Sequence, residues 1–195
     1  MHAERSFTLA DLAERLGVAQ HRLIHLCEKG VAAPDLQDAS GRGSSRVFSS
    51  RNVLELAVAL RLRDMMLPVS AVQAILQVLR TFEGQLEREL PGFSLPESLR
   101  DDGAPDLRIV LSDGRSIFFS LGVTGAQAKL FGGISVEEAI AGERGWDRKL
   151  RSAPGSSKER ASNAADPRAF GGPERSRFAR LELSVTEVAR DLPID

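Results

Sequence analysis

The chain has 195 residues, of which 42% are hydrophobic and 27% charged, a composition typical of a globular protein with a charged surface. Its 26 Lys and Arg residues nearly balance 27 Asp and Glu residues, which excludes a polycationic chain and requires any nucleic-acid surface to be a local patch. Cys27 is the only cysteine, which excludes an intrachain disulfide and a cysteine-rich zinc module. Because no apolar run approaches the roughly 18 residues that a membrane-spanning helix needs, we expect a cytoplasmic protein.

The first predicted elements are two short helices. Thr8 precedes the first helix, over residues 9–16, and Asp11 is placed to complete a capping box with it. A second helix is predicted over residues 19–29 and ends at Gly30, a typical C-terminal cap. Two short helices separated by a tight turn indicate a helix-turn-helix.

Residues 31–50 change character, because Pro, Asp, Ser and Gly accumulate before the β-favouring unit Arg46-Val47-Phe48. This pattern predicts an exposed hairpin tip with a returning strand. The segment 39–51 contains Arg42, Arg46 and Arg51 and no acidic residue. Glycines let a backbone approach DNA and arginines neutralise phosphates, so the hairpin is predicted to be a DNA-binding wing.

A third helix is predicted over residues 52–66 and a fourth over residues 69–90, with Pro68 between them. About 22 residues give a rod of about 33 Å, which exceeds what a small helical head needs for its own core. Such a helix suits an antiparallel pair with a second copy; the alternative is that it packs on the chain's own β hairpin. The apolar residues that recur every three or four positions along it are Val72, Ile75, Leu76, Leu79, Phe82, Leu86 and Leu90.

The second half of the chain is predicted to contain short strands. Residues 107–111 and 116–121 alternate in polarity and flank Asp113-Gly114, a strong hairpin signal. Residues 178–183 form a further alternating strand that can join the hairpin, and a last short helix follows Ser184.

Together these segments predict an α+β chain with an N-terminal winged helix-turn-helix, a long dimerisation helix and a small C-terminal antiparallel β unit with a disordered insert. The expected boundaries are 1–66 for the DNA-binding head, 67–92 for the long helix, 93–141 for the β-hairpin region, 142–175 for a flexible linker rich in Gly, Ser, Pro and charge, and 176–195 for the C-terminal strand and helix.

The N-terminal part resembles the MerR family of transcriptional regulators over roughly residues 6–80. Phe7–Ala13 with Leu16-Gly17-Val18 looks like the family's opening helix and turn. Arg46-Val47-Phe48-Ser49 is similar to its wing motif, Arg-x-Tyr-Ser, and residues 67–76 resemble the start of its fourth helix. After Leu23 the family usually has Arg-Tyr-Tyr-Glu, whereas this chain has Ile, His, Leu and Cys, which removes a phosphate-binding arginine.

The resemblance implies a sequence-specific regulator that binds double-stranded DNA as a homodimer joined through the long helix. Gln20 can pair with adenine, and His21 and Arg22 can reach guanine acceptors, while His25 sits at a position that is a frequent tyrosine contact in the family. The candidate DNA-binding residues are Thr8, Gln20, His21, Arg22, His25, Arg42, Arg46 and Arg51. The candidate dimer-interface residues are Leu76, Leu79, Phe82, Leu86 and Leu90.

The alternatives to a DNA-binding regulator are an interaction module, an architectural DNA factor, an enzyme and a metal-binding protein. A protein-interaction or assembly module could retain the helical head without specific DNA binding, and an excisionase-like architectural factor uses a similar head. No histidine follows His25, so no Ser-His-Asp arrangement can be drawn in the C-terminal half, and we expect no enzyme and no cofactor. His21 and His25 have metal-ligand spacing, but Cys27 lies about 200° round the helix from His25, so no metal is expected. We expect the β unit to recruit a protein or the second subunit.

Overall fold

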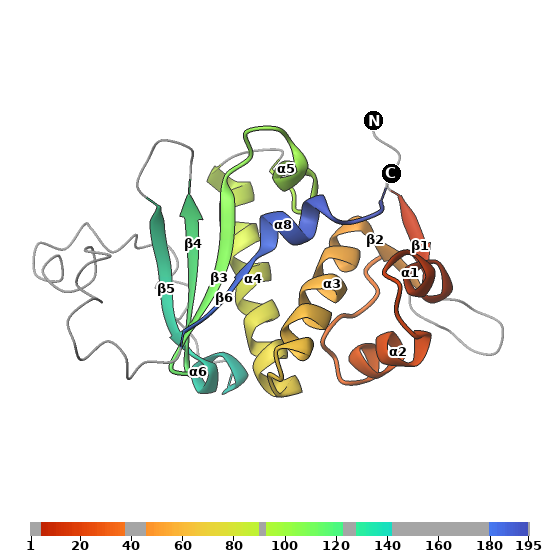
Figure 1. Ribbon diagram of the computed structural model, residues 1–195, viewed down its shortest axis with the longest axis horizontal. Helices are drawn as coiled ribbons and strands as arrows, with labels where there is room; N and C mark the ends of the chain where they lie inside the picture. Colours follow the sequence, from red (N-terminus) through yellow and green to blue (C-terminus); the bar gives the residue numbers. More distant parts are fainter. Residues whose placement is uncertain (1–4, 38–45, 90–92, 123–127, 142–179, 195) are drawn as a thin grey trace, which may run out of the picture.

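The structure is a computed structural model that describes residues 5–37, 46–89, 93–122, 128–141 and 180–194. The helices and strands follow the chain in an α+β order (Figure 1). They are β1 (Ser6–Thr8), α1 (Leu9–Arg15), α2 (Gln20–Glu28), β2 (Val47–Ser49), α3 (Ser50–Asp64), α4 (Val69–Glu89), α5 (Glu97–Arg100), β3 (Asp106–Ser112), β4 (Ser116–Gly122), β5 (Lys129–Ser135), α6 (Val136–Ala141), β6 (Arg180–Ser184) and α8 (Val185–Arg190).

The start of α1 has the predicted capping box. The Thr8 side chain accepts the Asp11 backbone N–H at 3.3 Å, and the Thr8 backbone N–H donates to Asp11 Oδ2 at 2.8 Å. These bonds satisfy backbone groups that the first turn leaves free. The Thr8 backbone N–H and the Thr8 hydroxyl both donate to Asp11 Oδ2, and they hold the pKa of Asp11 below its ordinary value. Gly17 and Gly30 follow the two helices with φ of 63° and 68°, a conformation that glycine adopts at little cost. The predicted helix-turn-helix is confirmed.

The returning strand of the hairpin is confirmed as β2, but its longer pairing is with a strand that the sequence did not predict. β1 precedes α1 and pairs with β2 antiparallel, with Phe7 opposite Phe48. Gln37 and Val47 form an isolated antiparallel bridge through two backbone hydrogen bonds of 3.3 and 2.9 Å. The predicted wing tip, including Arg42, lies outside the described residues.

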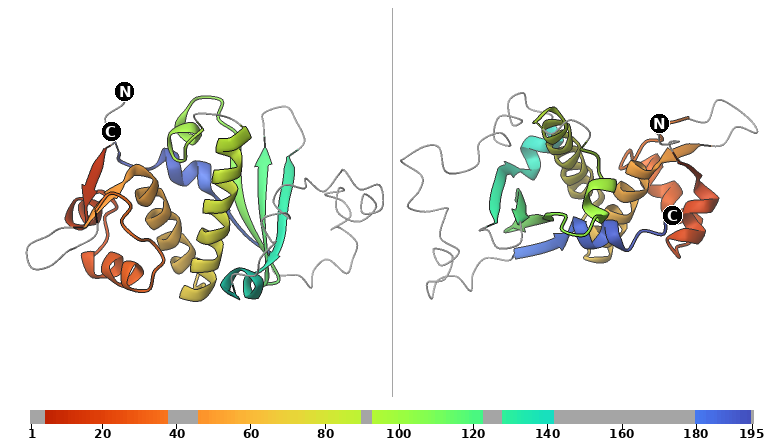
Figure 2. Two further views of the ribbon diagram at one scale, coloured as in Figure 1. Left: turned by 180° about the vertical axis from the view of Figure 1, so that it is seen from behind. Right: turned by 90° about the horizontal axis from the view of Figure 1, so that it is seen from above.

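Helix α4 is buried on nearly all sides. It lies between α3 and the sheet, so the head covers one side of it and the strands cover another (Figures 1 and 2). Leu76, Leu79 and Phe82 have exposed fractions of 0%, 3% and 2%. The Phe82 ring stacks on Phe119 of β4 with centroids 5.1 Å apart and planes inclined by 5°. A helix with apolar residues around its circumference is a core helix.

This burial corrects the expectation that Leu76, Leu79 and Phe82 contact a second copy of the chain. They pack inside their own chain, as in the alternative interpretation that the stripe covers the chain's own β unit. Leu86 is half-buried against the same core, and Leu90 lies outside the described residues. The long helix has nearly its predicted length. The surface that covers Leu76, Leu79 and Phe82 belongs to the same chain and not to a second copy.

The C-terminal strands form one antiparallel sheet in the order β5-β4-β3-β6. The predicted hairpin is confirmed as β3 and β4, with Ile109 opposite Phe119, and the predicted late strand is confirmed as β6, with Leu183 opposite Ile109. Strand β5 and helices α5 and α6 were not predicted. The linker expected over residues 142–175 lies outside the described residues.

The last described residues return to the head. Ser184 caps α8 by accepting the Glu187 backbone N–H at 3.1 Å, and α8 packs against both α3 and β3. Leu192 and Ile194 are buried in the same cluster as the head residues. The predicted head, long helix and β unit therefore share one continuous hydrophobic core. Within the described residues, no helix has the length and apolar character needed to cross a membrane.

Candidate nucleic-acid interface

Helix α2 offers one polar face to solvent. Leu23 and Leu26 are 0% and 3% exposed and anchor the helix in the head. His21 and His25 are four residues apart and exposed, and helical geometry places them on the side opposite these leucines. Gln20, the first residue of the helix, is also exposed. The second helix of a helix-turn-helix reads DNA with side chains near its N-terminus, so these positions suit base contacts.

A depression of about 260 Å³ lies between α2 and the C-terminal end of α3. Its polar lining consists of His21, Arg22, His25 and Arg63, and its apolar lining is Leu26 and Leu60. None of these six residues is acidic. The depression is therefore lined by a local excess of basic side chains, with Asp64 paired to Arg22 at its edge, in a chain whose total charge is close to zero.

Arg22 is held at the edge of this depression by an ion pair. Its Nη2 lies 2.7 Å from Oδ1 of Asp64, the last residue of α3. Both side chains are partly exposed, at 41% for Arg22 and 57% for Asp64. Arg22 therefore faces solvent in an orientation set by α3.

Two predicted wing arginines have different surroundings. Arg46 is half-buried immediately before β2. Arg51, at the start of α3, has its Nη2 2.7 Å from Glu83 Oε2 and its Nε 3.9 Å from Glu55 Oε1. Its guanidinium thus joins the head to α4, an internal use that the sequence did not reveal.

The base of the wing is fixed by a polar network that runs from exposed Asp35 to buried Asn52 and Glu55. Asp35 accepts the Ser49 backbone N–H at 3.0 Å, and its own backbone N–H donates to Asn52 Oδ1 at 3.1 Å. The Asn52 amide donates to Glu55 Oε2 at 3.2 Å. Arg80 of α4 donates twice to Glu55, at 2.6 and 2.8 Å, and this pairing raises the pKa of Arg80. Bidentate Arg–carboxylate pairs fix geometry as well as charge, so the wing strand, α3 and α4 are held in one arrangement.

Glu83 extends the network beyond α4. Its Oε1 accepts the Leu95 backbone N–H at 3.0 Å, while its Oε2 pairs with Arg51. Burial raises the pKa of Glu83, and the charge of Arg51 and the Leu95 hydrogen bond partly oppose the rise. A carboxylate in this position ties the head to the segment that leads into the sheet.

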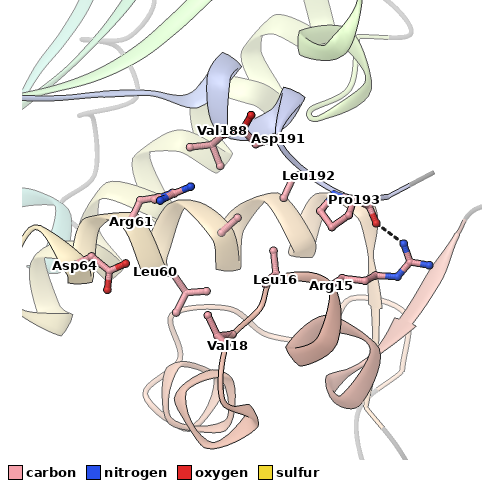
Figure 3. Close-up of a pocket in the computed structure, with 11 residues that line it drawn as sticks. Arg15, Leu16, Val18, Leu60, Arg61, Asp64, Val188, Asp191, Leu192 and Pro193 are labelled. Atoms are coloured by element: carbon pink, nitrogen blue, oxygen red, sulfur yellow. Dashed lines mark hydrogen bonds between the residues drawn. The ribbon is translucent and has the colours of Figure 1, made fainter.

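A second pocket, of about 190 Å³, lies where the C-terminal segment meets the head. Figure 3 shows Arg61 of α3 pointing toward α8, and the Asp64 carboxylate, which also lines the pocket, extending in a different direction. Arg15 of α1 donates to the Pro193 carbonyl across the pocket (Figure 3). These contacts join α1 to the chain's last residues.

The structure brings together only part of the predicted DNA-binding set. Gln20, His21, Arg22 and His25 are all exposed on α2, with Gln20 and Arg22 flanking the His21–His25 face on either side, whereas the hydroxyl of Thr8 is engaged in the capping box. Arg46 immediately precedes the wing strand β2, Arg51 is paired within the chain, and Arg42 is not described.

Sequence reasoning missed Arg63 and Asp64. Both belong to the last turn of α3, and the only local signal for them was a charged stretch that begins at Arg61. Their place beside α2 follows from tertiary packing.

Comparison with known proteins agrees with this geometry. A family model described as MerR HTH family regulatory protein matches residues 7–79, which span the head and the first half of α4. A comparison with curated proteins found no match. The chain therefore contains a MerR-family helix-turn-helix regulatory domain over residues 7–79, and that domain implies DNA binding and regulation of transcription.

Proposed function

We propose that the protein recognises specific double-stranded DNA sequences as a homodimer, with α2 in the major groove and the wing on the phosphate backbone. The observation that carries this proposal is the basic depression beside the exposed face of α2. The major groove of B-DNA admits a helix and displays a donor and acceptor pattern that identifies each base pair.

Individual roles follow from the chemistry of the exposed groups. Gln20 can donate to and accept from adenine, His21 and Arg22 can donate to guanine O6 and N7, and His25 lies next along the same face. Arg46 and Arg63 are assigned to phosphates, because cations beside the reading helix fix its register on the duplex. We leave Thr8 and Arg51 out of the DNA-contacting set, because Thr8 serves as the helix cap and Arg51 is paired with the buried carboxylates of Glu55 and Glu83, whereas Asp64, the partner of Arg22, is 57% exposed.

The homodimer is part of the proposal, with a changed interface. One helix-turn-helix reads a short half-site, and two heads related by twofold symmetry double the contacted length. Leu76, Leu79 and Phe82 are buried within the chain, so the second copy must dock on a surface other than this stripe. Light scattering combined with DNA titration measures whether one or two copies bind each site.

Selection from random DNA tests the function directly. The unmodified protein should enrich one sequence, and Gln20→Ala should change the enriched base at one position in each half-site. Arg46→Ala should lower affinity for all sequences by a similar factor. Glu137→Ala, which removes an exposed charge on α6 outside the head, serves as control and should leave both properties unchanged. Absence of sequence preference at any salt concentration would favour the protein-interaction module.

A further inference from the structure

The ion pair between Arg22 and Asp64 places an acidic side chain at the edge of a basic patch. Nη2 of Arg22 and Oδ1 of Asp64 are 2.7 Å apart. Figure 3 shows the Asp64 and Arg61 side chains extending in different directions from α3, although both line the second pocket. The 2.7 Å contact with Arg22 directs the Asp64 carboxylate toward α2.

Neither folding stability nor charge attraction to DNA accounts well for this aspartate. Both partners are exposed, at 41% and 57%, and exposed ion pairs contribute little to stability. A carboxylate beside a DNA-binding helix also repels phosphates and lowers affinity for all sequences. What the pair does supply is a fixed direction for a long and otherwise flexible guanidinium.

Arginine can serve two partners at once. Its guanidinium carries five N–H donors in a planar fork, and the Asp64 contact engages Nη2. The remaining donors can form the bidentate pair with O6 and N7 of guanine that is the commonest specific contact in the major groove. Holding the fork in place before binding reduces the entropy lost when that pair forms.

We propose that Asp64 is a positioning residue that sets the orientation of Arg22 for reading a guanine, and so determines base preference at one position of each half-site. This role rests on the proposed function, because it requires α2 to enter the major groove. It assigns to the end of α3 a part in specificity that involves no contact with DNA.

The experiment measures base preference and affinity separately. Asp64→Ala should reduce discrimination for guanine at the Arg22 position by about tenfold and should increase affinity for non-specific DNA, because a negative charge is lost. Asp64→Asn should act in the same direction with minimal change in shape, and Asp64→Glu should retain discrimination. Glu137→Ala removes the same charge on α6 and should leave discrimination unchanged. Urea unfolding should give similar midpoints for all four variants.

A double substitution identifies the mechanism. Arg22→Ala should abolish the guanine preference, and adding Asp64→Ala to it should cause no further loss of discrimination. The positioning role is overturned if the unmodified protein selects a site and the Asp64→Ala and Asp64→Asn proteins select it equally well. It is also overturned if Asp64→Ala reduces discrimination as strongly in the Arg22→Ala background. If the unmodified protein selects no sequence, the proposed function itself has failed.

Discussion

Replacing Phe82 by alanine distinguishes a core helix from a dimerisation helix. The Phe82 side chain is 2% exposed, its ring stacks on Phe119 at 5.1 Å, and its centroid is 5.4 Å from that of Phe131 at an interplanar angle of 50°. Truncation would remove the ring from the contact between α4 and the sheet. Buried Phe to Ala changes cost about 3–5 kcal/mol through lost burial and the cavity left behind. That is a large share of the roughly 5–15 kcal/mol typical of a domain.

Urea unfolding followed by circular dichroism measures this loss, and light scattering of the same samples reports the number of subunits. Phe82→Ala should lower the free energy of unfolding by about 3–5 kcal/mol without a specific change from dimer to monomer. Phe82→Leu should cost less, because leucine refills much of the volume. Gln77→Ala, an exposed position on the same helix, should have little effect. A Phe82→Ala protein of unchanged stability that dissociates from dimer to monomer would show that the stripe joins two subunits.

Three further substitutions test the wing, the network and the cap. Arg46→Ala should weaken binding to all sequences and reduce the slope of log affinity against log salt by about one unit; an unchanged slope would remove Arg46 from the interface. Burial raises the pKa of Glu83 above its ordinary value of 4.5. The free energy of unfolding of the unmodified protein, relative to that of Glu83→Gln, should therefore be greatest below pH 4.5 and should fall as pH rises through the folded-state pKa of Glu83. Urea unfolding of both proteins across this range measures the difference, and a difference that is constant with pH would contradict the prediction. Thr8→Ala should cost about 1 kcal/mol at pH 7. The alanine keeps the backbone N–H that lowers the pKa of Asp11 most and removes the hydroxyl that lowers it further, so part of the loss should disappear as pH falls through the folded-state pKa of Asp11; a loss independent of acid pH would refute the contribution of the hydroxyl.

The helices of the head were predictable because local signals determine them. Thr8 with Asp11 marks the start of α1, and Gly17 and Gly30 mark the ends of α1 and α2. The register of β3 with β4 was equally local, since Asp113-Gly114 determines the turn between two alternating strands.

Strand β5 was missed because its sequence does not alternate. Gly132 and Gly133 have φ of 107° and 81°, and the pairing with β4 shifts register between Ile117 and Phe118. A Cβ at Gly132 would lie 2.8 Å from the Ile117 carbonyl oxygen, so the close approach of the two strands requires glycine. A bulge of this kind disrupts the period of two that identifies a strand in a sequence.

The candidate site was predictable on α2 and not beyond it. Helical spacing places His21 and His25 on the face opposite Leu23, whatever the head packs against. The carboxylates that lie 2.7 Å from Arg22 and Arg51 are 42 and 32 residues away, at Asp64 and Glu83, and no periodicity links such distant positions. Polar pairs between helices follow from tertiary packing, which a single sequence does not display.

The apolar stripe of α4 predicted a buried face but not the surface that buries it. Apolar residues at helical spacing predict that a face is buried, and they carry no information on which surface buries it. Here the cover is the chain's own sheet, and that sheet also continues through β6 into α8, which packs on α3. The Arg15 side chain donates to the Pro193 carbonyl, which joins α1 to the segment after α8. The strands and α2 are therefore connected through α4, α3 and the C-terminal segment. Because the sheet and the head share one hydrophobic core, we expect a partner that binds only the folded sheet to stabilise the head as well.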